Sequence, residues 1–357
     1  MTAPRIEYAR NGDVSIAYAV TGSGPVDLLF VPGFVGNLDV ALSHPAIAPF
    51  WDRLRSFSRL INFDKRGQGL SDRGPYTVED VAADAVAVLD AVGVERASVF
   101  GVSEGGTAST MLAATYPERV AAMAQYGTYA RITRAADFPE GLSLDRLQRT
   151  WGRVAEGWAG PESLELFAPG AGRDQELLDF WGRMLRSGVS PSTMRTIGEM
   201  YTSLDIRSLL PGVNAPTLVM WRDADRLIPP SLSRVVADGI PGARAIELAG
   251  AAHLFFWGDT GRMLDEVEEH LTGRPAARNV ERVLATVLFV DIVDSTGRAS
   301  ELGDAAWRDV LRRSERAWRR EVEREGGAYV KSTGDGLLAT FDGPSRAARA
   351  ALAIRDA

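Results

Sequence analysis

The stretch GVSEGG at residues 101–106 holds a serine between small residues, in the pattern G-x-S-x-G. Small neighbours permit a strained strand-to-helix turn that lifts a serine hydroxyl clear of a sheet, where it can act as a nucleophile. The apolar run ASVFGV (97–102) predicts a buried strand before Ser103, and GGTASTMLAATY (105–116) predicts a helix after it. This placement favours a nucleophilic Ser103 over the alternative, a glycine-rich turn in which the serine is incidental.

A serine nucleophile needs a base, and the chain has three histidines. His44 precedes Pro45 early in the chain, and His270 lies in an acidic helical pattern, RMLDEVEEH. Only His253 follows a late apolar run, RAIEL (244–248), in a loop of sequence GAAHLFF. We therefore assign His253 as the general base; the alternative is a solvated loop histidine.

In the architecture that this serine turn predicts, the acid that orients the imidazole should lie between the serine and the histidine in chain order. The segment WRDADRLIPP (221–230) follows the apolar run PTLVMW and offers Asp223 and Asp225. We favour Asp225, because its place before Arg-Leu-Ile-Pro is typical of an acid at a strand end, and keep Asp223 as the second choice.

Length and composition limit the possible classes. With 357 residues the chain is long enough for two domains. A net charge of −7 argues against a nucleic-acid partner, and the absence of cysteine excludes disulfides, thiolate nucleophiles and Cys-based zinc sites. The N-terminus has no signal pattern and no apolar run is long enough to span a bilayer, so we expect a cytoplasmic protein with no membrane partner.

Short apolar runs alternate with helical patterns in the first 272 residues. The segment 77–92 has apolar residues at helical spacing, a Thr77 start signal with Asp80 three residues on, and Gly93 as its stop. Such alternation predicts an α/β fold with a mostly parallel sheet. Residues 129–210 lack a convincing strand, which predicts an inserted helical cap. The six apolar runs are 26–31, 59–63, 97–102, 120–126, 216–221 and 244–248.

Together these features resemble the α/β-hydrolase superfamily, over a domain of residues 1–272. FDKRGQGLSD (63–72) is similar to the family's D-x-R-G-x-G-x-S stretch, and FVPGF (30–34) occupies the position of its oxyanion loop. The resemblance implies that the backbone N–H groups of Phe34 and Glu104 hold the oxyanion. Glu104 departs from the expected pattern, because its carboxylate would oppose the developing negative charge unless a cation pairs with it.

The same resemblance implies acyl transfer to water on a small-molecule ester, thioester or lactone. Ser103 would attack the carbonyl, His253 would take and return the proton, and Asp225 would fix the imidazole tautomer. The cap carries aromatic and sulfur side chains that either line an acyl pocket or only pack the helices together: Trp151, Trp158, Phe167, Phe180, Trp181 and Met184.

A second domain is expected after the polar, Gly/Pro-punctuated segment 273–282, which reads as a linker. In residues 283–357, VLFVDIVDST (287–296) predicts a buried strand that ends at Asp291, followed by a helix capped by Asp294 with Ser295 and Thr296. This helix is expected to continue through residue 325. AYVKSTGDGLLATF (328–341) predicts two strands around a Gly-Asp-Gly turn.

These elements resemble, in their order, the class III nucleotide cyclase catalytic domain, an α+β, ferredoxin-like fold. The resemblance implies that Asp291, Asp335 and the Ile292 carbonyl hold two Mg²⁺ or Mn²⁺ ions, and that Lys331 reads the base of ATP. The product would be cyclic AMP with pyrophosphate. Each residue also has a plain alternative, because Asp335-Gly336 is a common hairpin turn and Lys331 could be a solvated strand residue.

Only about half of such a cyclase domain is present, so we expect the cyclase site to be incomplete. The resemblance also implies that the domain would form a homodimer when full length. Two interpretations of the whole chain remain open. In the first, a working serine esterase is joined to an adenylate cyclase. In the second, the N-terminal domain is a ligand sensor, with slow or no turnover, that regulates the cyclase.

Overall fold

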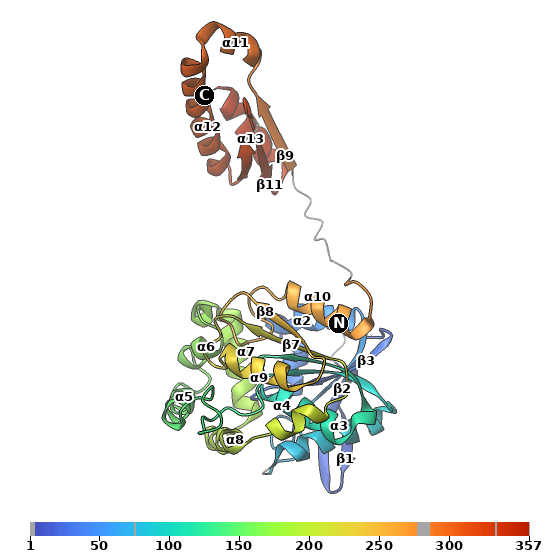
Figure 1. Ribbon diagram of the computed structural model, residues 1–357. Coiled ribbons are helices and arrows are strands. Elements are labelled where there is room, and N and C mark those ends of the chain that lie inside the picture. The colour runs from blue at the N-terminus through green and yellow to red at the C-terminus, as the bar shows by residue number, and fades with distance from the viewer. Residues whose placement is uncertain (1–3, 75, 277–285, 333, 357) are drawn as a thin grey trace. The chain divides into compact units, whose positions relative to one another are not determined.

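A computed structural model describes residues 4–356 of the chain, apart from residues 75, 277–285 and 333. The chain divides into two compact units, Met1–Ala277 and Arg278–Ala357 (Figure 1). Most of the predicted linker, residues 277–282, lies outside the described residues. No described helix has the length and apolar character needed to cross a membrane.

The first unit is built on an eight-stranded sheet of order β1-β2-β4-β3-β5-β6-β7-β8. β2 pairs antiparallel with β1 and β4, and the neighbours from β4 to β8 run parallel, as the alternation of runs predicts. The β1–β2 hairpin was not predicted. The strands are β1 (Glu7–Asn11), β2 (Val14–Thr21), β3 (Val26–Val31), β4 (Ser58–Phe63), β5 (Ala97–Val102), β6 (Val120–Tyr126), β7 (Thr217–Arg222) and β8 (Arg244–Leu248).

Helices cover both faces of this sheet. One core packs α3, α4 and α9 against the strands, and the other packs α2 and α10 with the cap. α3 begins with the predicted capping box of Thr77 and Asp80, and ends at Gly93, whose φ is 73°. The helices are α1 (Leu38–Ser43), α2 (Ala48–Arg55), α3 (Val78–Val92), α4 (Glu104–Thr115), α9 (Pro230–Gly239) and α10 (Gly261–Thr272), with short 3₁₀ turns η1 (Pro45–Ile47), η2 (Pro117–Arg119) and η4 (Arg207–Gly212).

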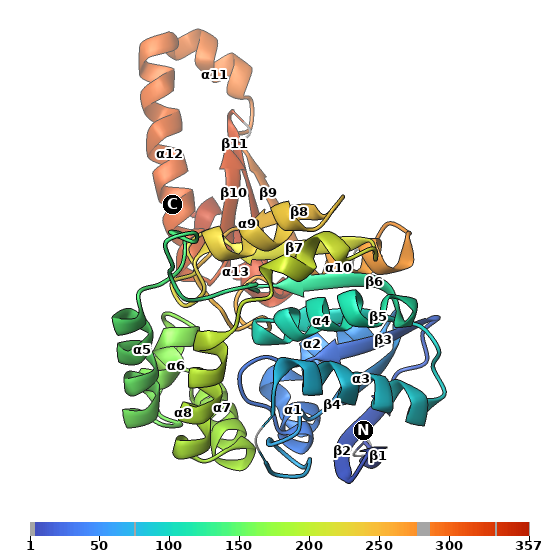
Figure 2. The same ribbon diagram turned by 60° about the horizontal axis from the view of Figure 1, so that its bottom comes forward.

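Four helices form the cap between β6 and β7, within the predicted range 129–210. Figure 2 shows them gathered together beside the sheet. α7 is amphipathic: Asp174 caps its N-terminus, and its inner face buries Phe180, Trp181, Met184 and Leu185. The cap helices are α5 (Leu144–Glu156), α6 (Pro161–Phe167), α7 (Gln175–Gly188) and α8 (Pro191–Ser203), with the turn η3 (Ala171–Arg173).

The second unit contains a three-stranded antiparallel sheet of order β10-β11-β9. Its apolar core joins the sheet to α12 and α13 and includes Val322, Leu337 and Phe341. The arrangement is therefore α+β. Its elements are β9 (Thr286–Asp291), α11 (Ser295–Leu302), α12 (Asp304–Arg324), β10 (Ala328–Ser332), β11 (Gly336–Phe341) and α13 (Pro344–Arg355).

Three local expectations for this unit were wrong. β9 was predicted to be buried, but none of its residues is, and Phe289 is 71% exposed, because only the face with Leu288 and Val290 packs against the core.

The predicted long helix is broken at Gly303, whose φ of 74° suits only glycine readily, so α11 and α12 are separate. Asp294 precedes α11 but makes no capping hydrogen bond with its side chain. Its backbone is left-handed, with φ 56°, and its carboxylate lies against Gly297 rather than over the free N–H groups of the first turn.

The N-terminus of α4 packs directly on the end of β3, and a glycine makes this possible. A Cβ on Gly105 would lie 2.2 Å from the Val31 carbonyl oxygen and 2.6 Å from that of Pro32. Both obstacles are backbone atoms and cannot rotate away. Because α4 carries the turn after Ser103, this contact sets the distance between that turn and the loop that follows β3.

We expect Gly105→Ala to lower the free energy of unfolding by about 1–3 kcal/mol through this overpacking. Chemical denaturation monitored by circular dichroism measures the change. Gly212→Ala is the matched control, because a Cβ there meets nothing within 4 Å. Equal stability of the two variants would contradict the proposed backbone contact.

Candidate active site

Ser103 occupies a sharp turn between β5 and α4. Its φ of 55° and ψ of −126° are unusual for a residue with a Cβ, and such strain is common at functional sites. The Ser103 N–H donates to the Tyr126 carbonyl oxygen at 2.8 Å, which ties the turn to β6. The sheet therefore holds the serine in a conformation that it would not adopt freely.

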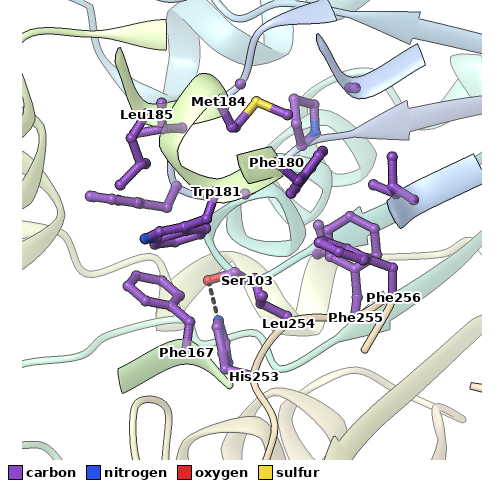
Figure 3. A pocket seen from close by; sticks show the side chains of 18 of the residues that line it. Ser103, Phe167, Phe180, Trp181, Met184, Leu185, His253, Leu254, Phe255 and Phe256 are labelled. Atoms are coloured by element: carbon purple, nitrogen blue, oxygen red, sulfur yellow. Dashed lines mark hydrogen bonds between the residues drawn. The ribbon is translucent and has the colours of Figure 1, made fainter. Parts of the chain in front are cut away.

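Ser103, His253 and Asp225 form a hydrogen-bonded relay. His253 Nε2 lies 2.8 Å from Ser103 Oγ, and His253 Nδ1 lies 2.7 Å from Asp225 Oδ2 (Figure 3 shows the first bond). The second Asp225 oxygen accepts from the N–H groups of Leu227 and Ile228 at 2.9 and 3.0 Å. The side chains of His253 and Asp225 are both buried. Asp225 therefore holds the imidazole with Nδ1 protonated, which leaves Nε2 free to accept the serine proton.

The second choices from the sequence lie elsewhere. Asp223 is exposed and accepts from the Gly250 N–H at 2.9 Å. His44 is buried, with Nε2 3.1 Å from Asp179 on α7. His270 faces the carbonyl oxygens of Met123 and Pro216. Each of these side chains has a local structural partner.

A buried arginine holds the loop that carries His253. Arg222, the last residue of β7, donates to the carbonyl oxygens of Ala249 at 2.6 Å and Asp259 at 2.8 Å. It also donates to the Tyr126 hydroxyl, which in turn donates to the Ala252 carbonyl at 2.7 Å. Arg222 was not among the residues predicted from the sequence, although an arginine at the end of the apolar strand TLVMWR was a visible signal.

The loop after β3 lies against the nucleophile. A Cβ on Gly33 would be 3.1 Å from the Ser103 Cβ, so the Gly33–Phe34 peptide is next to the serine. Within the described part of the chain, no acceptor engages the backbone N–H of Phe34 or of Glu104. Two free donors therefore flank Ser103, which is the arrangement that an oxyanion requires.

Lys65 provides the cation that the Glu104 carboxylate needs. Its fully buried ammonium group pairs with Glu104 Oε1 and donates to the Gly33 carbonyl oxygen at 2.7 Å. Burial lowers the pKa of Lys65 and raises the pKa of Glu104, while the attraction between the two groups opposes both shifts. The pair adds no net charge beside the oxyanion position, whichever partner carries the proton.

Two cavities meet at Ser103. The larger one, about 100 Å³, is an apolar chamber that α7 and the loop after β8 enclose (Figure 3). Of the six cap side chains considered, Phe167, Phe180, Trp181 and Met184 line this chamber. Trp151 instead lines a narrow inner cavity of about 20 Å³ with Ser103 and Glu104, and Trp158 lines neither cavity.

In the second unit, Asp291 and Asp335 lie together at one end of the sheet. Asp291 at the end of β9 pairs in register with Gly336, and the Ile292 N–H donates to the Asp335 carbonyl oxygen at 3.2 Å. The Ser295 hydroxyl donates to the Asp335 carboxylate and is the main reason that the pKa of Asp335 is lowered. Lys331 is exposed on β10, at the opposite edge of the sheet from β9.

These groups offer two carboxylates and the Ile292 carbonyl, the hard oxygen donors that Mg²⁺ and Mn²⁺ take. In the described residues, no group of three or more His, Asp or Glu side chains is arranged to hold a metal ion. The donor types are therefore ones that a divalent ion takes, and the described residues supply two carboxylates and one carbonyl of this kind.

Residues 28–260 match the family model described as alpha/beta hydrolase fold. The protein named "Putative carbamate hydrolase RutD" of Azorhizobium caulinodans is 30% identical over 256 residues, 70% of this chain and 91% of that protein. A pimeloyl-acyl-carrier-protein methyl ester esterase of Neisseria meningitidis is 29% identical over 188 residues, 51% of this chain and 70% of that protein. The solved enol-lactonase of Burkholderia xenovorans has a TM-score of 0.63 at 24% identity, over 74% of this chain and all of that one. The chain therefore belongs to the α/β-hydrolase family.

Proposed function

We propose that the first unit hydrolyses an ester, thioester or lactone of a small acyl compound. The observation that carries this proposal is the continuous hydrogen-bonded relay from Asp225 through His253 to Ser103 beside an apolar chamber. The names of the two similar curated proteins, a carbamate hydrolase and a methyl ester esterase, support attack on a carbonyl carbon.

In the proposed reaction, His253 Nε2 takes the Ser103 proton as Oγ bonds to the substrate carbonyl carbon. The leaving group then departs with that proton, and an acyl-serine remains. A water molecule repeats the sequence: His253 accepts its proton, the hydroxide adds to the acyl carbon, the acyl–Oγ bond breaks to release the carboxylic acid, and the proton returns to Ser103 Oγ. Asp225 stabilises the imidazolium that forms in each half-reaction.

Lys65 acts in this scheme as a positioning residue for the oxyanion hole. The Gly33 carbonyl and the Phe34 N–H belong to one planar peptide unit, and they point in opposite directions. Because Lys65 holds the carbonyl at 2.7 Å, it also fixes the direction of the N–H. The same ammonium holds the side chain of Glu104, whose N–H is the second donor.

For the second unit we propose a cyclase-like function in which it binds ATP and divalent metal ions. Asp291, Asp335 and the Ile292 carbonyl would hold Mg²⁺ or Mn²⁺, Lys331 would contact the base, and the unit would act as a homodimer. Bound metal would supply charge neutralisation of the triphosphate. This proposal is supported by Asp291 at the end of β9 and by Asp335, which directly precedes β11 on the paired strand.

We expect Ser103→Ala to reduce hydrolysis of p-nitrophenyl butyrate on the order of 10⁴-fold, because the nucleophile is lost while the fold remains. The absorbance of the released p-nitrophenolate measures the rate. Ser109→Ala is the control, since this buried serine only donates to the Gly105 carbonyl within α4. If correctly folded wild-type protein shows no turnover of short esters, the alternative role of a ligand sensor for the second unit replaces this proposal.

We expect Lys65→Met to lower the free energy of unfolding by about 3–5 kcal/mol, because it leaves the Glu104 carboxylate buried without a partner. It should also lower kcat about 100-fold with little change in KM, since the oxyanion donors lose their support.

The double variant Lys65→Met with Glu104→Gln separates the two effects. It removes the unpaired charge, so most of the stability should return, while kcat should stay low because Gly33 is still not held. Full recovery of kcat in the double variant would contradict the positioning role of Lys65.

For the second unit, we expect isothermal titration calorimetry to detect Mn²⁺ binding to the full chain in the presence of a non-hydrolysable ATP analogue. Asp291→Asn and Asp335→Asn should each weaken it at least about 10-fold, as the loss of a charged oxygen ligand requires. Asp342→Asn, beyond the end of β11, is the control. Unchanged affinity in both acid variants would rule out the assigned ligands.

A further inference from the structure

A basic hollow lies on the surface of the cap, next to the active site. Its volume is about 510 Å³, and α5, the end of α6 and the loop after β7 enclose it. Four arginines and one acid supply all of its charged lining, in a chain whose net charge is −7. The lining residues are Arg146, Arg149, Thr150, Arg153, Glu165, Leu166, Pro169 and Arg226.

Most of the positive charge in this hollow is not neutralised. Arg149 pairs with Asp145 one turn earlier on α5, and Arg146 donates to the Arg226 carbonyl oxygen at 2.8 Å. Among the described residues, no carboxylate forms a salt bridge with Arg146, Arg153 or Arg226. Glu165, the one acid in the lining, accepts from the Gly170 N–H.

The hollow and the narrow inner cavity share a wall. Thr150 on α5 lines both of them, and the inner cavity reaches Ser103 and Glu104. The loop after β7 joins them a second time, because Arg226 lines the hollow while the next residue, Leu227, lines the inner cavity. When a ligand places its carbonyl at Ser103, the arginines of the hollow therefore lie beyond the inner cavity.

One side chain that lines the inner cavity has a polar atom without a partner. In the described part of the chain, the buried Nε1 of Trp151 has no hydrogen-bond acceptor. A buried donor without an acceptor is costly. The cavity volume of about 20 Å³ admits only a slender group.

The two sides of Ser103 therefore differ in chemistry. The chamber under α7 is apolar and lined by aromatic rings, whereas the inner cavity borders a surface rich in guanidinium groups. Guanidinium groups bind carboxylate and phosphate oxygens through paired hydrogen bonds, and they are the preferred side chains for these anions.

We propose that the hollow is a subsite for an anionic group of the substrate, which is an ester or thioester with an apolar part in the chamber and a slender arm that ends in a carboxylate or a phosphate. Arg146, Arg153 and Arg226 bind that anion. This inference rests on the proposed hydrolase function.

Two substrate pairs test the subsite with the full chain. The first compares mono-p-nitrophenyl adipate with p-nitrophenyl hexanoate, which differ by a terminal carboxylate. The second compares hexanoyl-coenzyme A with the hexanoyl thioester of N-acetylcysteamine, which lacks the phosphates together with the pantoate and the nucleoside; the arginine variants below separate the effect of the charge. We expect kcat/KM to favour the anionic member of at least one pair about 10-fold or more, through KM, as charged hydrogen bonds would give. The pair that responds identifies the anion.

Arg153→Met and Arg226→Met should each lower the anionic-to-neutral ratio of kcat/KM about 10-fold, and added salt should lower it in the wild type. Arg195→Met is the control, because this exposed cap arginine does not line the hollow. A ratio near one in both pairs, while the neutral esters are hydrolysed, would overturn the inference and leave the hydrolase function intact.

Calorimetry with the Ser103→Ala variant measures binding of the anionic compounds without turnover. It therefore tests the subsite even if the protein hydrolyses no ester. Binding of adipate monoester or hexanoyl-coenzyme A that Arg153→Met weakens about 10-fold would support the subsite even if the hydrolase function fails. Absence of binding by both anionic compounds would overturn it.

Discussion

One buried ammonium group joins the parts of the active site. Lys65 donates to the Gly33 carbonyl, which belongs to the same peptide unit as the Phe34 N–H. It also pairs with the carboxylate of Glu104, the residue that follows the nucleophile. Without this cation, Glu104 would place an unpaired charge beside a developing oxyanion, and burial would make that charge costly. The FDKRGQG loop, the oxyanion loop and the turn at Ser103 therefore depend on the same interaction. Gly105 adds a steric constraint, because its missing side chain lets α4 approach β3.

A second set of hydrogen bonds holds the histidine and the aspartate of the relay. Arg222 and Tyr126 together engage several backbone carbonyls of the loop that carries His253, and the N–H groups of Leu227 and Ile228 fix Asp225. The three residues of the relay come from loops after three different strands, so only a rigid sheet and these buried hydrogen bonds can keep them in contact. The cap then divides the space around Ser103 into an apolar chamber and a narrow cavity that borders the basic hollow.

Much of the first unit was predictable because its signals are local. Apolar runs with turn residues between them predicted six of the eight strands, and Thr77, Asp80 and Gly93 marked the ends of α3. Chain order suggested Ser103, Asp225 and His253 before their distances were known. The β1–β2 hairpin was missed although β2 contains the apolar run IAYAV; its partner β1, EYARN, is short and mostly polar and gives no comparable signal. In the second unit, the helix was expected to continue through residue 325, whereas the left-handed backbone of Gly303 ends α11.

By itself, the sequence determined the α/β-hydrolase fold, the place of the cap and the identity of the residues that could form a relay. These follow from hydrophobic periodicity and from short motifs, which act over a few residues. Three features came from the packing of distant segments instead: Lys65 neutralises Glu104 across 39 positions of the chain, Arg222 holds the histidine loop, and arginines from α5 and from the loop after β7 share one hollow. Such partners are chosen by packing between distant segments, because the cost of burying a charge depends on which other segment lies beside it.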